Sequence, residues 1–323
     1  MDFSKVKGFN YQPGFAYNSY EAWRFFDADT MQREIGRGKR YFPKTNAIRL
    51  WLSYDAFRYE EDRQAENFET ALKILDGLGL KALPVLFNCW HDGFMDNGGI
   101  YINQIVPGSC RCSNGFEVMY DSFVEKIVGA HAKDDRIIAW DICNEPFSYG
   151  YNERFAKIVK PYEFSWLEKI YKMCKAAGAA QPLAVSLCMD PFEDNELVAH
   201  ISDIAMIHPY YYFCDEDIKN KSYAGYVELL KKYKAFAAAH GKQVLTTEVC
   251  WGSLDDLKRA EIVRLSLSAH AECGIGFIVH ALNYSHVADL HDAQDGVVGS
   301  PGNLAFIDKE GKIRKGHEVF NEF

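Results

Sequence analysis

Eight short, mostly apolar runs recur along the 323 residues of the chain, and helical patterns separate them. Most of these runs are apolar almost throughout, which is typical of parallel strands that are covered on both faces. The pattern predicts strands at residues 6–11, 46–53, 81–88, 137–143, 182–188, 204–212, 243–249 and 276–282.

Amphipathic helices are predicted between these strands. Apolar side chains repeat at helical spacing in residues 62–78, 116–130 and 223–237, and a shorter helix is expected near residues 193–200. Glycines that precede a strand mark the expected helix ends, and these are Gly79, Gly178, Gly241 and Gly274.

Eight consecutive βα units predict a closed (β/α)8 TIM barrel. The alternative is an open doubly wound sheet, which needs a glycine-rich phosphate-binding turn after a strand. The turn after the first strand reads Gln12-Pro13-Gly14 and lacks that pattern. Because no linker or low-complexity tract interrupts the chain, we expect a single (β/α)8 domain over residues 1–323.

Charge and composition limit the partners. The chain has 36 Lys and Arg against 45 Asp and Glu, a net charge of −9, which argues against nucleic acid and anionic membranes as partners because both are polyanions. Aromatic residues make up 15% of the chain, which suits a protein that stacks on flat ligands, although large cores also use aromatic residues.

The compartment is expected to be the cytoplasm. No apolar run approaches the length of a membrane span, and residues 1–30 contain no basic-then-apolar signal, although removal of a signal would leave the same pattern. Nine cysteines, an odd and scattered set, are typical of reduced thiols in a cytoplasmic protein.

Two predicted strands end in a glutamate. Glu145 follows the fourth strand and Glu248 lies at the end of the seventh. Barrels place catalytic groups at the carboxyl ends of their strands, and strands four and seven stand on opposite sides of the ring, so both side chains can flank one bond. Glycoside hydrolysis needs such a pair, in which one carboxyl donates a proton and the other stays ionised.

These residues resemble a known family. Asn144-Glu145-Pro146 and Glu248, with Arg49 in the second strand and His208-Pro209-Tyr210 after the sixth, are similar to the motifs of clan A glycoside hydrolases, closest to the family 5 cellulase and mannanase type. The resemblance implies a retaining β-glycosidase without metal or cofactor. Its carbohydrate substrate would be a β-linked gluco- or manno-configured oligo- or polysaccharide, cleaved through a covalent glycosyl-enzyme.

The resemblance also implies roles for individual residues. Glu145 would be the acid/base, Glu248 the nucleophile, and Asn144 the ligand of the sugar 2-OH. Independently of the resemblance, Arg49 near Glu248 would keep that carboxylate ionised, and Tyr210 could orient it by donating a hydrogen bond. The full set expected to bind substrate is Arg49, Asn144, His208, Tyr210, Trp90, His91, Trp251, His280 and Tyr284.

The eighth strand departs from the family pattern. Members of this type carry a Trp at its end that floors the subsite of the cleaved sugar, whereas here the segment from Phe277 to Tyr284 contains none. Tyr284, His280 or Trp251 could take its place. The long segment of residues 89–114 after the third strand is expected at the mouth of the barrel.

Two alternatives stay open at this point. His286, Asp289, His291 and Asp292 cluster after the eighth strand, and such residues could bind a divalent metal as in a sugar isomerase barrel. The chain could also be a non-catalytic barrel that binds carbohydrate. Asp141 lies four residues before Glu145, so in a strand the two side chains point to the same side, and Asp141 is expected to be a buried structural acid.

Overall fold

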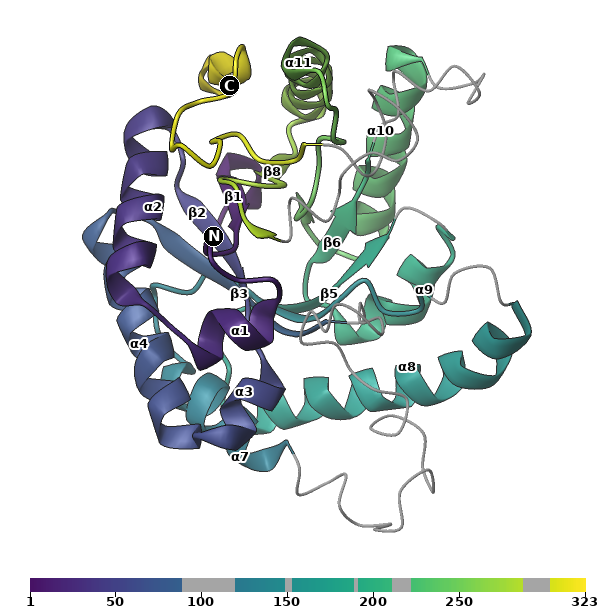
Figure 1. Cartoon of the computed structure of the whole chain (residues 1–323). Coiled ribbons are helices and arrows are strands. Elements are labelled where there is room, and N and C mark those ends of the chain that lie inside the picture. The colour runs from purple at the N-terminus through teal and green to yellow at the C-terminus, as the bar shows by residue number, and fades with distance from the viewer. Residues whose placement is uncertain (89–119, 149–152, 189–190, 211–221, 287–302) are drawn as a thin grey trace.

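The barrel is closed, with eight parallel strands that neighbour one another in chain order (Figure 1). The ring closes between β1 and β8, where Phe9 pairs with Val279. The strands are β1 Lys7–Tyr11, β2 Ala47–Trp51, β3 Lys81–Asn88, β4 Trp140–Asn144, β5 Leu183–Cys188, β6 Ala205–His208, β7 Val244–Thr246 and β8 Gly276–Val279. This computed structural model describes residues 1–88, 120–148, 153–188, 191–210, 222–286 and 303–323.

Each strand overlaps its predicted run, and the (β/α)8 prediction is confirmed. β4 ends one residue later than predicted, at Asn144, and four strands, β2, β6, β7 and β8, end earlier. β6 stops at His208 because Pro209 has no N–H with which to continue the ladder. β7 stops at Thr246, so Glu248 lies beyond the last ladder residue rather than within the strand.

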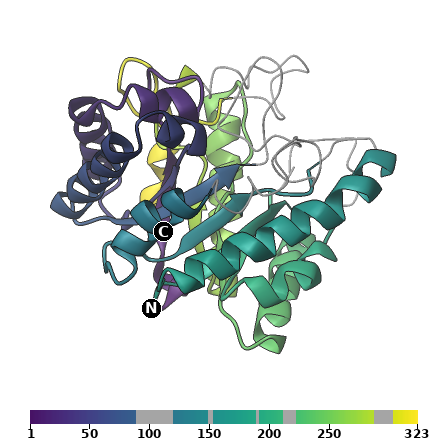
Figure 2. The same ribbon diagram turned by 90° about the horizontal axis from the view of Figure 1, so that it is seen from below.

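Helices cover the outside of the barrel, with α1 to α4 along one flank and α10 and α11 on the opposite side (Figure 1). The long helix α8 ends close to Gly178, where a helix end was expected, and runs past the strands in the view from below (Figure 2). In the described part of the chain, the α-helices of more than three residues are α1 Ser19–Arg24, α2 Ala28–Tyr41, α3 Tyr54–Tyr59, α4 Glu61–Gly77, α8 Glu153–Ala176, α9 Asp194–Val198, α10 Tyr223–Ala239 and α11 Asp256–Cys273.

The helix expected at residues 116–130 is only partly α-helical where it is described. It consists of the short turn α7 Asp121–Phe123, the π-helical turn η2 Val124–Val128 and the 3-10 turn η3 Gly129–His131. Other 3-10 turns are η1 Phe3–Lys5, η4 Ala199–Ile201 and η5 His317–Glu322. The predicted glycine at the end of α11 is confirmed, because Gly274 has a φ of 62°.

Apolar side chains form two layers around the strands. The larger lies between strands and helices, where Phe9 packs against Phe42 and Phe320 with ring centroids 5.0 and 4.4 Å apart. The inner layer fills the barrel itself, as in other closed barrels. Its members from the strands are Ala47, Leu83, Ala184, Met206, Leu245 and Ile278.

The turn η1 closes the amino end of the barrel. Phe3 is buried there beside Val6, and both belong to the inner layer. At Gly276, where β8 begins, a Cβ atom would lie 2.0 Å from the Phe3 carbonyl oxygen and 3.0 Å from that of Val6. Position 276 is therefore restricted to glycine by backbone that cannot move aside easily.

Replacing Gly276 with Ala is expected to lower the free energy of unfolding by about 3 kcal/mol, because the added methyl group overlaps backbone atoms. Urea denaturation followed by circular dichroism measures the change. Gly77→Ala is the matched control, since that exposed glycine in α4 has nothing within 4 Å of the new methyl group and should be neutral or slightly stabilising. Equal stability of both variants would contradict the close approach.

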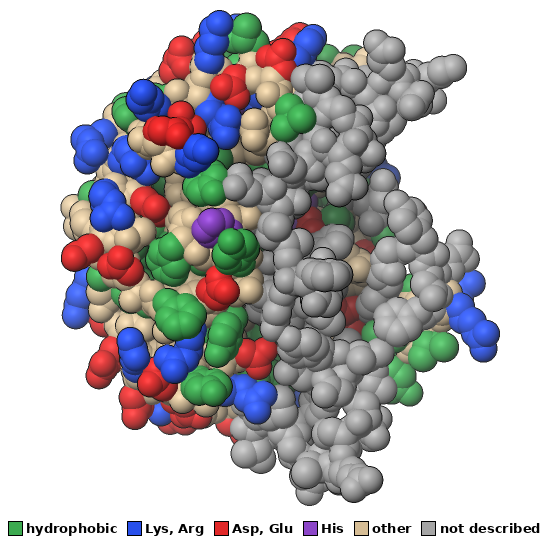
Figure 3. All heavy atoms as spheres, viewed as in Figure 1, with side chains coloured by type: hydrophobic (Ala, Val, Ile, Leu, Met, Phe, Trp, Pro, Cys, Tyr) green, Lys and Arg blue, Asp and Glu red, His purple; other side chains and the backbone are tan. Residues whose placement is uncertain are grey.

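The described surface carries mixed charge. On the face shown in Figure 3, Lys and Arg side chains are interspersed with Asp and Glu, with scattered apolar side chains between them. Among the described helices, none combines the length and the apolar character that crossing a membrane requires.

Candidate active site

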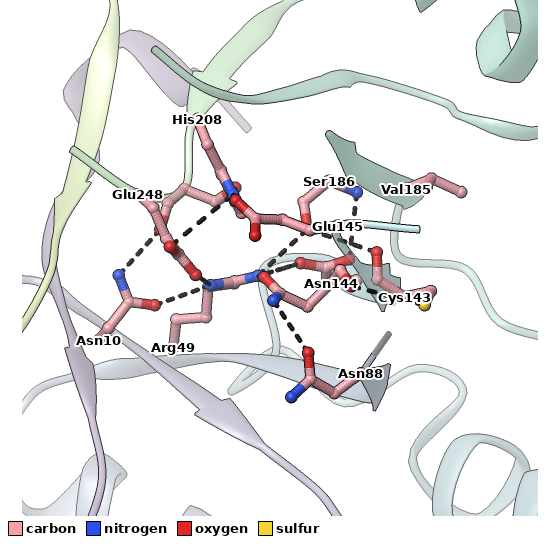
Figure 4. A network of polar contacts seen from close by, with 12 residues as sticks. Asn10, Arg49, Asn88, Cys143, Asn144, Glu145, Val185, Ser186, His208 and Glu248 are labelled. Atoms are coloured by element: carbon pink, nitrogen blue, oxygen red, sulfur yellow. Dashed lines mark hydrogen bonds and ion pairs between the residues drawn. The ribbon is translucent and has the colours of Figure 1, made fainter. Parts of the chain in front are cut away.

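The carboxyl ends of the strands bring the predicted catalytic groups together (Figure 4). Arg49 projects from β2, Asn144 ends β4 with Glu145 directly after it, His208 ends β6, and Glu248 follows β7. All five side chains are buried. Residues that are far apart in the chain thus form one polar network inside the barrel mouth.

Arg49 lies at the centre of this network and is fully buried. Its guanidinium contacts the carboxylates of Asp141 and Glu248, both at 2.7 Å, and donates to the side-chain oxygens of Asn144 at 2.6 Å and Asn10 at 2.9 Å. Burial tends to lower the pKa of Arg49, but the charges of the two carboxylates outweigh burial and raise it. Arg49 is therefore a fixed positive charge, and Asp141 is the buried structural acid that was expected.

Glu248 is surrounded by groups that favour its ionised form. Arg49 donates to Oε1 at 2.7 Å, and the Tyr210 hydroxyl donates to Oε2 at 2.8 Å. Burial by itself raises the pKa of Glu248, but the charges of His208 and His280, followed by that of the guanidinium, outweigh burial and hold the pKa well below its usual range. Glu248 is consequently a carboxylate at neutral and mildly acidic pH.

Tyr210 keeps its proton beside this carboxylate. Burial, and next the negative charge of Glu248, raise the pKa of the Tyr210 hydroxyl well above its ordinary value. Its ring also contacts Trp251 edge to face, with centroids 5.3 Å apart. The predicted Tyr210 contact is therefore present, and Trp251 lies beside it.

Glu145 has different partners. Its Oε1 lies 2.6 Å from Nδ1 of His208 and accepts a hydrogen bond from the Cys188 thiol at 3.0 Å. The backbone of Glu145 has a φ of 47°, in the left-handed region that non-glycine residues rarely occupy, and its N–H donates to the Ser186 carbonyl at 2.9 Å. Such strained positions cluster at functional sites, because the surrounding structure has to maintain them.

The two glutamates face one another closely. One oxygen of Glu145, one oxygen of Glu248 and a ring nitrogen of His208 all lie within 4.8 Å of one another. Three such atoms could ligate a metal ion, but Arg49 and Tyr210 already occupy both oxygens of Glu248. A cation there would sit next to the buried guanidinium, so the surroundings disfavour a metal.

A second group that could hold a metal lies away from the barrel mouth. Glu69, His131 and Asp134 also bring one ligand atom each within 4.8 Å. The guanidinium of Arg136 fills this group, 2.7 Å from Glu69 and 2.5 Å from Asp134. We interpret it as an ion-pair cluster of the outer helical layer.

Two candidates for the floor of the sugar subsite differ in position. His280, directly after β8, lies 5.8 Å from the ring of Trp51, and the Trp51 ring faces the Arg49 guanidinium at 4.7 Å. Trp51 is half-buried. Tyr284 instead lies beside His286, with ring centroids 6.0 Å apart.

Several predicted residues lie outside the described part of the chain. Trp90 and His91 belong to residues 89–119, and the long segment of residues 89–114 that was expected at the mouth of the barrel lies in the same range. Of the proposed His and Asp cluster only His286 is described, and its ring stacks on Tyr17 at 4.1 Å. The remaining members, Asp289, His291 and Asp292, fall within residues 287–302.

Other polar residues of the network were not predicted. The Nδ2 of Asn144 donates to the Oδ1 of Asn88 at 3.0 Å, and Nε2 of His208 lies 3.0 Å from the hydroxyl of Thr247. In the sequence they share a polar or thiol side chain near the carboxyl end of an apolar strand, whereas the predicted site rests on the glutamates at such ends. The residues missed in this way are Asn10, Asn88, Ser186, Cys188 and Thr247.

No protein-family model matches the chain, and no curated protein matches its sequence. Its structure is similar to solved barrels. A variant of GH5_18 from Streptomyces cattleya, solved with Manβ1-4GlcNAc, has a TM-score of 0.75 at 12% identity, covering 98% of this chain and 79% of that one. GH5_18 from Bifidobacterium longum subsp. longum gives 0.74 at 15% identity, with 98% and 78% covered.

The exo-beta-1,4-mannosidase Op5Man5 from Opitutaceae bacterium strain TAV5 has a TM-score of 0.71 at 15% identity, covering 98% of this chain and 58% of that one. At these identities the likeness establishes the fold. The chain therefore has a (β/α)8 barrel similar to those of the GH5_18 proteins and the mannosidase.

Proposed function

We propose that the chain is a retaining β-glycosidase, with residues 1–323 as one catalytic domain. The observation that carries the proposal is a pair of buried carboxyl groups, one oxygen of each lying within 4.8 Å of the other, with Glu248 paired to the buried Arg49. Retaining enzymes keep their two carboxyl groups about 5–5.5 Å apart, whereas inverting enzymes leave room for a water between them.

In the first step of the proposed reaction, the Glu248 carboxylate attacks the anomeric carbon and forms a glycosyl ester. The glycosidic C–O bond breaks, and Glu145 gives its proton to the departing oxygen. In the second step Glu145, now ionised, takes a proton from water, whose oxygen attacks the same carbon and releases Glu248. Two displacements at one carbon retain the β-configuration.

The roles follow from the different surroundings of the two groups. The nucleophile must be ionised, and Arg49 and Tyr210 both stabilise a negative charge on Glu248. Glu145 contacts His208 and the Cys188 thiol, whereas Arg49, a permanent cation, contacts Glu248. His208 lies near both carboxyl groups, 2.6 Å from Glu145 and 3.8 Å from Glu248, so it does not distinguish them. Glu145 is therefore assigned as the acid/base.

The proposed substrate is a short β-linked oligosaccharide of gluco or manno configuration. Among the similar structures, one protein is described as an exo-beta-1,4-mannosidase and another was solved with Manβ1-4GlcNAc, so a β-mannoside is the first substrate to test. Half-buried Trp51, beside Arg49, and Trp251, beside Tyr210, offer faces for the C–H surface of a sugar. The scattered cysteines favour the cytoplasm as the compartment.

A panel of aryl β-mannoside, glucoside, galactoside and xyloside tests the proposal. We expect hydrolysis of the mannoside or glucoside, with the same rate before and after dialysis against EDTA. Loss of activity in EDTA would favour a metal-dependent sugar isomerase barrel. Binding of oligosaccharides without turnover of any aryl glycoside would indicate a non-catalytic carbohydrate-binding barrel.

A further inference from the structure

The thiol of Cys188 lies against the proposed acid/base. Cys188 ends β5, is half-buried, and donates from Sγ to Oε1 of Glu145 at 3.0 Å. β5 carries none of the side chains assigned so far to the reaction. The thiol is therefore a group at the reacting centre that the proposed steps leave unused.

Strand β5 holds Glu145 at two points. The Ser186 carbonyl accepts the backbone N–H of Glu145 at 2.9 Å, and two residues later Cys188 donates to its carboxyl group. Residues two apart on a strand point to the same side. The backbone and the side chain of Glu145 are thus both fixed to one strand, which matters because its backbone occupies the left-handed region.

Two contacts of the Glu145 carboxyl group converge on the same oxygen. Cys188 and His208 are register partners on β5 and β6, and each approaches Oε1, at 3.0 and 2.6 Å. Two contacts from adjacent strands restrict rotation of the carboxyl group. Restricting it also sets the direction in which Oε2 points.

We propose that Cys188 is a positioning residue that holds Oε1 of Glu145 so that proton transfer to the leaving group runs through Oε2. The inference rests on the proposed function and names a further part of the same site. In the transfer, the O–H bond of Glu145 breaks and an O–H bond forms on the departing oxygen, while the thiol keeps its own proton. A thiol is a weak hydrogen-bond donor, so it can orient the carboxyl group without strongly stabilising its ionised form.

The test compares Cys188→Ala and Cys188→Ser with the unmodified protein on phenyl and dinitrophenyl β-glycosides. A phenolate leaves slowly without a proton, whereas dinitrophenolate needs none. We expect Cys188→Ala to lower kcat/KM for the phenyl glycoside about tenfold and to change it less than twofold for the dinitrophenyl glycoside. Cys188→Ser keeps a hydroxyl donor and should retain at least a third of the phenyl activity.

The pH profile supplies a readout that a packing defect would not move. Loss of a donor makes the ionised carboxylate less favourable, so the basic limb of kcat/KM for the phenyl glycoside should move upward by roughly 0.5 pH unit in Cys188→Ala. Cys273→Ala is the matched control, because that buried thiol donates to the Val227 carbonyl between α10 and α11. It should leave both substrates and the profile unchanged.

The outcomes separate this proposal from the proposed function. If Glu145→Ala loses phenyl but not dinitrophenyl activity while Cys188→Ala behaves as the unmodified protein, the positioning role is wrong and the acid assignment stands. An equal loss on both substrates in Cys188→Ala also overturns the positioning role. If Glu145→Ala shows no selective loss of phenyl glycoside activity, the assignment of Glu145 as the acid is wrong, and with it the proposed function.

Discussion

Glu248→Ala is expected to lower kcat about 10⁵-fold on every substrate, because it removes the group that forms the covalent intermediate. The loss should not depend on the leaving group, since the attack itself is abolished. Added azide can enter the space left by the side chain and attack from the same face. It should restore turnover and give a glycosyl azide of inverted, α configuration, which NMR of the product identifies.

Glu69→Ala is the matched control, because it also removes a carboxylate paired with an arginine, Arg136, but in the outer helical layer. It should retain full activity. Circular dichroism must show both variants folded, and Arg49 still has Asp141 as a partner when Glu248 is gone. Substantial residual activity of folded Glu248→Ala would rule out its role as nucleophile.

Glu145→Ala is expected to lower kcat/KM for a phenyl glycoside about 10³-fold and to spare that of a dinitrophenyl glycoside within about tenfold. The reason is that only the poor leaving group requires the proton. With the dinitrophenyl substrate, azide should speed release of the glycosyl-enzyme and give an azide product of retained, β configuration. Steady-state kinetics over a series of phenols gives the dependence on the leaving group.

An inverted azide product from Glu145→Ala would reverse the two assignments. A uniform loss over the whole series of phenols would instead mean that Glu145 positions the substrate without donating a proton. The pair of variants thus distinguishes the two carboxyl groups by product configuration as well as by rate.

The barrel and the pair of glutamates could be predicted because both depend on local patterns. Apolar runs define the strands, and the ring of eight places the ends of the fourth and seventh across one mouth. With Arg49 inside the second strand, and Glu145 and Glu248 just past the fourth and seventh, the topology predicts that these side chains meet at one place. The structure brings them together as expected.

The remaining contacts depend on tertiary register, which local patterns do not contain. Arg49 reaches Asn10, 39 residues before it, and Asp141, 92 residues after it. Cys188 meets Glu145 because the pairing of β4 with β5 aligns Asn144 with Ser186. A cysteine at the end of an apolar strand reads as a small buried hydrophobe, so its sequence context gave no reason to assign it to the site.

The most direct test of the account is to locate the covalent sugar. A glycosyl fluoride whose 2-OH is replaced by fluorine forms the glycosyl-enzyme but releases it slowly, because fluorine destabilises the oxocarbenium-like transition states of both steps. Proteolysis and mass spectrometry then identify the labelled residue. The account predicts one sugar per chain, on Glu248. A label on Glu145, or turnover without any label, would contradict it.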